Sequence, residues 1–268
     1  MITSNNNAKV KQVVQWQTKA KERRKDHVFL AEGVRMCEEA PVKSVREVYL
    51  TEELEQKIKQ NAKNGDAGFW EKLQQTGYET VSPEVFAKMA DTQTPQGILT
   101  VLEQPSYELE QLLKQPDPLF LILENLQDPG NLGTMIRTGE GAGITGVIMN
   151  NQTVDIFNPK TIRATMGSIF RVPFVYVPEL SPVLTQMHEK GIHTYAAHLK
   201  GEKYYDSFSF REPTAFLIGN EGNGLSREIS DQAGQYLKIP MEGKVESLNA
   251  SIAAALLMYE AHRQRSTK

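Results

Sequence analysis

Phe216-Leu-Ile-Gly-Asn-Glu-Gly-Asn-Gly-Leu-Ser226 is the stretch that decides the fold of this 268-residue chain, together with a second segment, Ile239-Pro-Met-Glu-Gly-Lys-Val-Glu-Ser-Leu-Asn249. Each segment starts as an apolar, strand-like run and ends in a polar turn that contains glycine. In an open α/β sheet, ligands bind at the turns that follow the carboxyl ends of the strands. We therefore expect the two turns to enclose one small cofactor, to which the rest of the chain brings a substrate.

Strand-like and helix-like segments alternate along most of the chain, which predicts two α/β domains. The continuous apolar run Leu119–Leu123 is typical of a parallel strand that is buried on both faces. From there onward the alternation predicts a mostly parallel sheet with helices on both faces, so we expect residues 118–268 to form the larger domain. The same alternation over residues 26–103 predicts a small N-terminal α/β domain, and the proline-containing stretch 104–117 predicts a linker.

The N-terminal segment is strongly basic. Residues 1–25 hold seven lysine and arginine residues against one glutamate, although the whole chain has a net charge of −3. The pattern predicts one exposed helix with Val10, Val13 and Trp16 among the residues of its packing side. Such a basic segment can attract phosphates. The alternative is that this basic helix face is exposed to solvent and binds no partner.

Composition restricts the class of protein. No run of about 18 apolar residues exists, so we expect no membrane-spanning helix. The polar start of the chain lacks the apolar core of a secretory signal. Cys37 is the single cysteine, which excludes an internal disulfide and fits a reducing cytoplasm. The five histidines show no zinc-ligand spacing, so we expect no metal site.

Two glycine-rich stretches resemble nucleotide-binding loops without meeting their requirements. Gly141-Ala-Gly-Ile-Thr-Gly146 matches the dinucleotide fingerprint, which needs a strand before it and a helix after it. The predicted order here is the reverse, so these glycines are better explained as the end of a helix and a turn. The stretch 219–224 lacks the Lys-Ser/Thr ending of a P-loop. An oxidoreductase that uses the first stretch is kept as an alternative.

Arg137 is a candidate functional residue in addition to the two turns. Asp128-Pro129 predicts the start of a helix that runs to about Ala142, and this helix carries the arginine two turns from its beginning. An arginine among apolar neighbours is difficult to bury without a partner. A surface arginine paired with Glu140 or Glu124 is the alternative.

Three of these segments resemble the three motifs of the SpoU (TrmH) family of S-adenosylmethionine-dependent RNA ribose 2'-O-methyltransferases, within the SPOUT class. Asn131–Arg137 is similar to the first motif, Gly219–Leu225 to the second and Ile239–Asn249 to the third. The resemblance covers about residues 118–268. Residues 27–102 also resemble the small substrate-binding domain that precedes the catalytic domain in many members.

The resemblance implies a C-terminal trefoil knot, which would be a rare exception to the rule against threaded chains. It implies that the knot binds S-adenosylmethionine through four residues: Gly219, Ile239, Met241 and Leu248. It also implies that Arg137 acts on the ribose 2'-hydroxyl and that four more catalytic-site residues hold it and the ribose in place: Asn131, Glu221, Ser247 and Asn249.

The family further implies a homodimer that uses the last helix, on which Ile252, Leu256 and Tyr259 share a side. The N-terminal domain favours ribosomal RNA as the substrate, and no membrane partner is expected. A transfer RNA methyltransferase and a non-catalytic RNA-binding protein of the same fold are the alternatives.

Overall fold

The computed structural model describes residues 1–266, so the last two residues of the predicted larger domain lie outside the described part. The chain divides into two compact units. The first comprises Met1–Pro105 and Asp155–Phe170, and the second comprises Ser106–Val154 and the chain from Arg171 onward. Residues 155–170 fall within the sequence range predicted for the larger domain, yet they pack in the first unit.

The first unit is built on a four-stranded sheet in the order β1-β4-β2-β3. β4 runs antiparallel to both β1 and β2, whereas β2 and β3 are parallel. The strands are β1 (Val28–Glu32), β2 (Val45–Thr51), β3 (Glu79–Val81) and β4 (Ile98–Glu103). The helices between them are α3 (Val34–Glu39), α4 (Glu52–Lys63), α5 (Gly68–Thr76) and α6 (Pro83–Met89), with a short 3-10 turn, η1 (Val42–Ser44).

The basic N-terminal segment forms two helices, α1 (Ala8–Thr18) and α2 (Ala20–Asp26), rather than one. The helix is interrupted at Lys19, whose φ of −124° and ψ of 108° are extended. The predicted packing side of α1 is buried against α6 and the sheet, since Val13 is 0% exposed. The guanidinium of Arg23 is also buried and pairs with Asp155 at 2.6 Å. The segment is therefore part of the folded unit, with its other basic side chains exposed: Lys9, Lys11, Lys19, Lys21, Arg24 and Lys25.

The stretch 155–170 packs on β1. It contains α9 (Pro159–Thr165) and a 3-10 turn, η2 (Ser168–Phe170). The rings of Phe157 and Phe29 lie 5.1 Å apart between centroids, and Arg163 of α9 pairs with Asp91. Apolar contact together with these ion pairs explains why this stretch belongs to the first unit.

The second unit contains a six-stranded sheet in the order β10-β8-β9-β5-β6-β7, in which every pair is parallel. This confirms the predicted α/β class with a mostly parallel sheet. The strands are β5 (Leu119–Leu123), β6 (Gly146–Asn150), β7 (Phe174–Val177), β8 (His193–Ala197), β9 (Thr214–Ile218) and β10 (Gln235–Leu237). β5 lies at the centre and all five of its residues are buried, as the continuous apolar run predicted.

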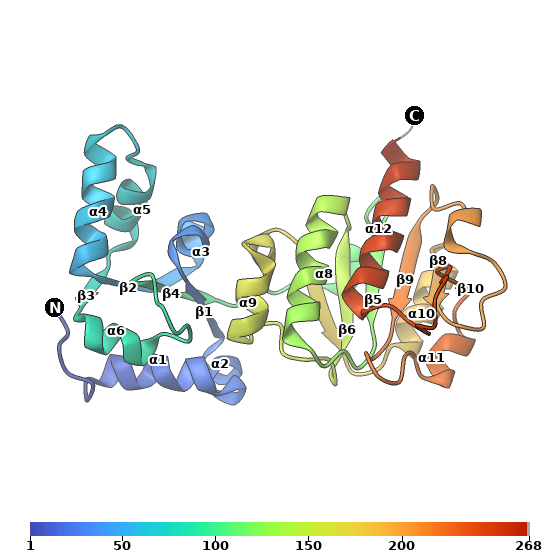
Figure 1. The fold of residues 1–268 in the computed structure, drawn as a ribbon, viewed down its shortest axis with the longest axis horizontal. Coiled ribbons are helices and arrows are strands. Elements are labelled where there is room, and N and C mark those ends of the chain that lie inside the picture. Colours follow the sequence, from blue (N-terminus) through green and yellow to red (C-terminus); the bar gives the residue numbers. More distant parts are fainter. Residues whose placement is uncertain (267–268) are drawn as a thin grey trace. The chain divides into compact units, whose positions relative to one another are not determined.

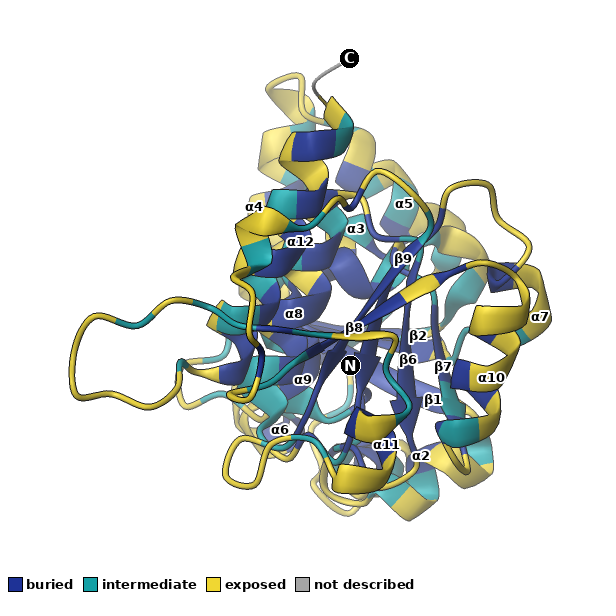
Figure 2. Ribbon diagram, turned by 90° about the vertical axis from the view of Figure 1, so that its right-hand side faces the viewer, coloured by how far each residue is buried: buried dark blue, intermediate teal, exposed yellow. Residues whose placement is uncertain are grey.

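Helices cover both faces of this sheet (Figure 1), and Figure 2 shows the central strands buried between them. Phe120 and Ile122 point into an apolar cluster with the helices of one face: α7 (Leu109–Leu112), α10 (Ser181–Glu189) and α11 (Arg227–Asp231). α8 (Pro129–Ala142) and α12 (Ala250–Ser266) pack against each other on the other face. A 3-10 turn, η3 (Tyr205–Ser207), follows β8.

The predicted boundaries of α8 are confirmed. The side chain of Asp128 accepts a hydrogen bond from the N–H of Asn131 at 2.8 Å, and Pro129 occupies the first turn. The helix ends at Gly143, whose φ of 76° is left-handed, and β6 begins three residues later. The glycines at 141–146 therefore follow a helix and precede a strand, which is the wrong order for a dinucleotide fingerprint.

No helix in residues 1–266 is long and apolar enough to cross a membrane.

Candidate active site

The loops that follow β5 and β9 meet at the carboxyl ends of these neighbouring parallel strands, where α/β sheets bind ligands. Asn220 donates a side-chain hydrogen bond to the carbonyl of Asn125 at 2.8 Å. Both oxygens of the Glu124 carboxylate, which is buried, accept from Ser226, one from its N–H and one from its hydroxyl, each at 2.7 Å. The two loops are thus tied together at both ends of the second motif.

The second motif is a tight, self-paired turn. Asn220 and Gly224 exchange two backbone hydrogen bonds of 3.0 and 2.8 Å, and the side-chain oxygen of Asn220 accepts from the N–H groups of Gly222 and Asn223. A Cβ at position 219 would lie 2.1 Å from the carbonyl carbon of Gly224, which no side chain tolerates. Gly219 is therefore required by the close approach of two backbone segments.

Glu221 connects this turn to the start of α8. Its carboxylate accepts three hydrogen bonds, from the N–H of Gln127 at 3.0 Å, from the N–H of Asp128 at 2.9 Å and from the Nδ2 of Asn131 at 3.0 Å. Partial desolvation raises the pKa of this carboxyl, but the hydrogen bonds together outweigh it and the pKa is lowered. Glu221 therefore stays ionised and acts as a strong acceptor.

Asn131 also forms a hydrogen bond with the third motif. Its Oδ1 accepts a hydrogen bond from the Nδ2 of Asn249 at 3.0 Å. The Oδ1 of Asn249 in turn caps α12, since it accepts from the N–H of Ser251 at 2.9 Å and from the hydroxyl of Ser251 at 2.7 Å. The side chain of Asn131 thus joins all three motifs, through Glu221 on one side and Asn249 on the other. We call Asn131, Glu221 and Asn249 the amide–carboxylate cluster.

Arg137 is exposed on α8, on the helix face that also carries Gly130 and Gly133. Across residues 1–266, its guanidinium has no hydrogen bond or ion pair. The alternative of a structural ion pair is wrong for both candidate partners, because Glu140 pairs with Arg171 and Glu124 bonds Ser226. An exposed arginine without a structural partner is available to contact a substrate.

The segment 239–249 has neither helix nor strand conformation. Between Ile239 and Leu248, its backbone makes no hydrogen bond to the backbone of the described residues. Ile239, Met241 and Leu248 are half-buried, whereas Ser247 is exposed and lies outside the amide–carboxylate cluster. Unpaired backbone donors and acceptors beside half-buried apolar side chains fit a flat heteroaromatic group such as adenine.

Several residues of the site were missed by sequence reasoning. Asn125, Gln127, Asp128 and Asn220 all lend backbone or side-chain groups to the junction between the loops. Their position could have indicated them, because the first three lie in the polar loop directly after the buried strand β5. Asn125 adopts a left-handed φ of 56°, which asparagine tolerates better than most residues. In residues 1–266, no three histidine, cysteine or acidic side chains are grouped as metal ligands.

Comparison with known proteins agrees with the motifs. The SpoU rRNA Methylase family matches residues 118–259, and the MRM3-like substrate binding domain matches residues 7–100. The chain therefore belongs to the SpoU rRNA methylase family, and the resemblance of its three motifs is confirmed.

Individual relatives are similar over nearly the whole chain. The 23S rRNA (guanosine(2553)-2'-O)-methyltransferase RlmP of Bacillus subtilis (strain 168) is 34% identical, over 96% of this chain and 97% of its own length. An AdoMet-bound rRNA methyltransferase from Sinorhizobium meliloti superposes with a TM-score of 0.85 at 28% identity, covering 98% of this chain and 97% of that one. The SpoU methyltransferase AviRb from Streptomyces viridochromogenes, in complex with AdoMet, has a TM-score of 0.83 at 27% identity, over 98% and 99% of the two chains.

Proposed function

We propose that this protein transfers a methyl group from S-adenosylmethionine to a ribose 2'-hydroxyl of ribosomal RNA. The observation that carries the proposal is the convergence of the three family motifs on Asn131, next to a segment with unpaired backbone groups. The similar proteins described above, which include ribosomal RNA methyltransferases and AdoMet complexes, support the same activity.

A direct test supplies methyl-labelled S-adenosylmethionine to the purified protein with ribosomal RNA and transfer RNA from cells that lack it. Label in ribosomal RNA, mapped to a ribose 2'-oxygen, is the expected result. Label in transfer RNA alone would favour the alternative substrate. RNA binding without any label would identify a non-catalytic RNA-binding protein, and binding of NAD in place of the methyl donor would support the oxidoreductase alternative.

S-adenosylmethionine would supply a methyl group bonded to a positively charged sulfur. As the ribose 2'-oxygen bonds to this carbon, the carbon–sulfur bond breaks, a neutral thioether leaves and the hydroxyl proton passes to solvent. The missing side chain of Gly219 lets the turn of the second motif close on the backbone of Gly224, and in this proposal the backbone of that turn contacts the ligand. Ile239, Met241 and Leu248 provide half-buried apolar surface for its adenine, and the unpaired backbone groups between them provide donors and acceptors. We assign cofactor binding to these four residues.

Arg137 acts as a charged donor in this proposal. An arginine side chain remains protonated in proteins, so it is poorly suited to remove a proton. Its guanidinium instead stabilises the negative charge that develops on the 2'-oxygen and orients the ribose. Asn131, Glu221 and Asn249 fix the loops around the reacting groups, and the exposed hydroxyl of Ser247 is available to the substrate.

Three further properties of the family are carried over as parts of the proposal. We propose that the segments around residues 219–226 and 239–249 form a trefoil knot, which the return of the chain from β10 to Asn131 supports. We also propose that the protein works in the cytoplasm, which fits its single, unpaired cysteine and a ribosomal RNA substrate. The third property is a homodimer formed through α12.

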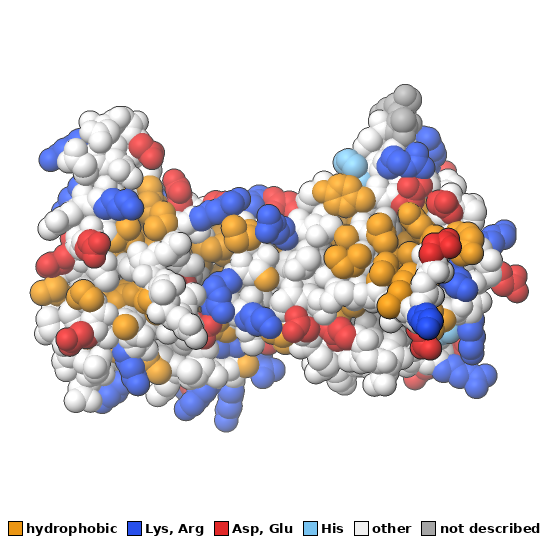
Figure 3. Space-filling model, in the orientation of Figure 1, with side chains coloured by type: hydrophobic (Ala, Val, Ile, Leu, Met, Phe, Trp, Pro, Cys, Tyr) orange, Lys and Arg blue, Asp and Glu red, His pale blue; other side chains and the backbone are white. Residues whose placement is uncertain are grey.

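The dimer proposal is supported by an apolar surface on α12. Ile252 and Tyr259 are 50% and 49% exposed, and Leu256 lies between them along the helix. They border a shallow hollow of about 380 Å³, and Figure 3 shows hydrophobic side chains gathered on this face of the second unit. Contiguous exposed apolar surface of this kind marks a protein interface.

Replacing Leu256 with lysine is expected to dissociate the dimer, because it places a charge in the centre of this apolar surface. Sedimentation at micromolar concentration would show a dimer for the unmodified protein and a monomer for the variant. Gln186→Lys, which adds the same charge to the exposed side of α10, is the matched control and should stay dimeric. A monomeric unmodified protein would contradict the proposal.

The exposed basic side chains of α2 are expected to contact RNA phosphates. Removing residues 1–25 would also remove Val10, Val13 and Trp16 from the core, so substitution is the cleaner test. The triple change of Lys21, Arg24 and Lys25 to glutamine should weaken RNA binding and reduce the slope of log K against log salt by about 2 to 3. The same change at Lys43, Lys63 and Lys88, which are exposed elsewhere in the unit, serves as the control. An equal slope in both variants would refute the contact.

A further inference from the structure

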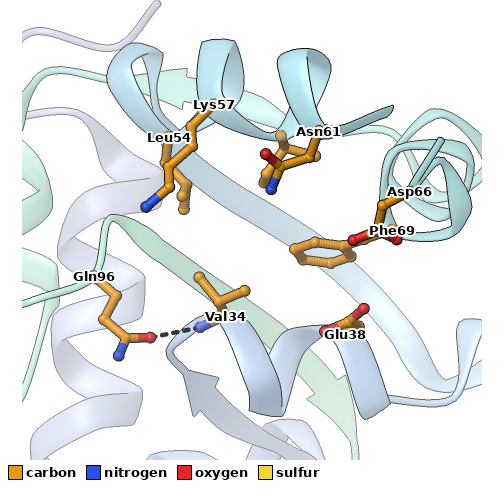
Figure 4. Close-up of a pocket in the computed structure, with 9 residues that line it drawn as sticks. Val34, Glu38, Leu54, Lys57, Asn61, Asp66, Phe69 and Gln96 are labelled. Carbon is orange, nitrogen blue, oxygen red and sulfur yellow. Dashed lines mark hydrogen bonds between the residues drawn. The ribbon is translucent and has the colours of Figure 1, made fainter. Parts of the chain in front are cut away.

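The first unit contains a cavity that no part of the proposed catalytic site uses. It has a volume of about 540 Å³, within the usual range for small-ligand sites, and lies between α3, α4 and α5 (Figure 4). Its apolar walls are formed by Val34, Leu54, Ile58 and Phe69. The ring of Phe69 faces the cavity (Figure 4).

Hydrogen bonds within the protein hold one wall of this cavity in place. The Oε1 of Gln96 accepts a hydrogen bond from the N–H of Val34 at 2.8 Å, which joins the start of α3 to the loop before β4. That loop is anchored in turn by the carboxylate of Glu32, which accepts from the N–H of Asp91 at 2.8 Å and from the hydroxyl of Thr92. A preformed cavity loses less conformational entropy when a ligand binds.

Three polar side chains around the cavity form no contacts that the fold requires. Lys57, Asn61 and Asp66 are exposed, and their side chains make no hydrogen bond or ion pair with any residue from 1 to 266. Figure 4 shows Asn61 directed into the cavity from α4. Their donors and acceptors are therefore available to a ligand.

These groups are divided between the two ends of the cavity. Glu38, Asp66 and the Phe69 ring lie at one end in Figure 4, and Lys57 lies with Gln96 at the other. An aromatic ring beside carboxylates suits a planar base that donates hydrogen bonds, and a lysine at the far end suits a phosphate. The two ends together have the chemical character of a nucleotide site.

We propose that this cavity binds an unpaired guanine nucleotide of the RNA, with the base at the Phe69 end and a phosphate near Lys57. Guanine is the base whose Watson–Crick edge carries two adjacent donor positions, N1–H and N2–H₂, which match the two oxygens of one carboxylate. Adenine, cytosine and uracil each offer a single donor position on that edge. Stacking against an aromatic ring and pairing along this edge is the usual way in which single-stranded RNA is recognised.

The proposal rests on the proposed function for its RNA ligand, but its test does not require methyl transfer. The isotopically labelled full chain is titrated with guanosine 5'-monophosphate and with cytidine 5'-monophosphate, and the backbone amide resonances are followed by nuclear magnetic resonance. Guanosine monophosphate should shift the amides of residues 58–69 and bind at least about fivefold more tightly than the cytidine nucleotide, since it gains a bidentate pair.

Asp66→Asn should remove this preference, because the amide replaces one acceptor oxygen with a donor. Glu53→Gln is the matched control, since Glu53 is exposed on α4 outside the cavity. Equal binding of the two nucleotides, or shifts confined to residues 219–249, would overturn the proposal. So would stronger binding of N-acetylarginine amide, which would identify the cavity as a site for a basic protein side chain.

A parallel assay separates this proposal from the proposed function. In methyl transfer to ribosomal RNA, Asp66→Asn should raise KM about fivefold or more and leave kcat unchanged, because Asp66 lies in the first unit, within the match to the substrate binding domain and outside the proposed catalytic site. Normal methyl transfer with no nucleotide bound in the cavity would overturn the cavity proposal alone. Nucleotide binding without methyl transfer to any RNA would overturn the proposed function alone.

Discussion

Replacing Arg137 with alanine is expected to lower the rate of methyl transfer at saturating substrates by about 100-fold or more, the range for loss of a charged transition-state donor. The guanidinium is exposed and has no structural partner among the residues described, so its removal should not disturb the fold. The four residues assigned to the cofactor do not include it, and the Kd for S-adenosylmethionine should therefore be unchanged. Single-turnover kinetics and calorimetric titration measure the two quantities.

Two further variants make this result specific. Arg137→Lys keeps the positive charge but loses the planar pair of donors, so its rate should fall between those of the unmodified protein and the alanine variant. Arg227→Ala removes an arginine that is 93% exposed on α11, and its rate should be normal. A near-normal rate for Arg137→Ala would remove this residue from the mechanism.

Replacing Asn249 with alanine is expected to reduce both stability and activity. The change removes the cap of α12, which costs about 0.5 to 2 kcal/mol. It also removes the hydrogen bond to Asn131 and so releases the third motif from the amide–carboxylate cluster. We expect the rate of methyl transfer to fall about tenfold or more, since misplacement of about 1 Å can cost that much and more. Thermal unfolding and initial rates are the measurements.

Asn249→Ser separates the two effects. Serine is as good a helix cap as asparagine, so the free energy of unfolding should stay close to that of the unmodified protein. Its short side chain carries no amide to donate to Asn131, and activity should remain low. If Asn249→Ala proved stable and fully active, neither the cap nor the contact with Asn131 would matter to the site.

Sequence patterns predicted those parts of the fold that depend on neighbouring residues. The apolar run 119–123 indicated a central buried strand, and Asp128-Pro129 indicated where α8 begins. The resemblance to the family, rather than any local pattern, named Asn131, Glu221, Ser247 and Asn249 together, and hydrogen bonds connect all of them except Ser247. The hydrogen bonds between them could not be derived from the pattern, since they join residues about ninety or more positions apart.

The sequence did not predict against which of the two units a given helix packs. The pattern of α9 is that of any short helix, and nothing in it indicated that residues 155–170 pack on β1 of the first unit. The charges of residues 1–25 suggested one exposed helix with a packing side at Val13, which is buried, but they did not indicate that the guanidinium of Arg23 is buried and pairs with Asp155. Burial of this kind is set by tertiary contacts that local propensity does not encode.

The hydrogen bond between Asn131 and Asn249 joins residues 118 positions apart, and it is the later in chain order of the two bonds by which the side chain of Asn131 connects the motifs. During synthesis on the ribosome, the loops after β5 and β9 emerge well before residue 249 does. A nascent chain at that stage can pair Asn131 with Glu221 but has no partner for the remaining amide oxygen. The active site therefore becomes complete only after residue 249 has been made, later in synthesis than either of the loops that Asn131 and Glu221 connect.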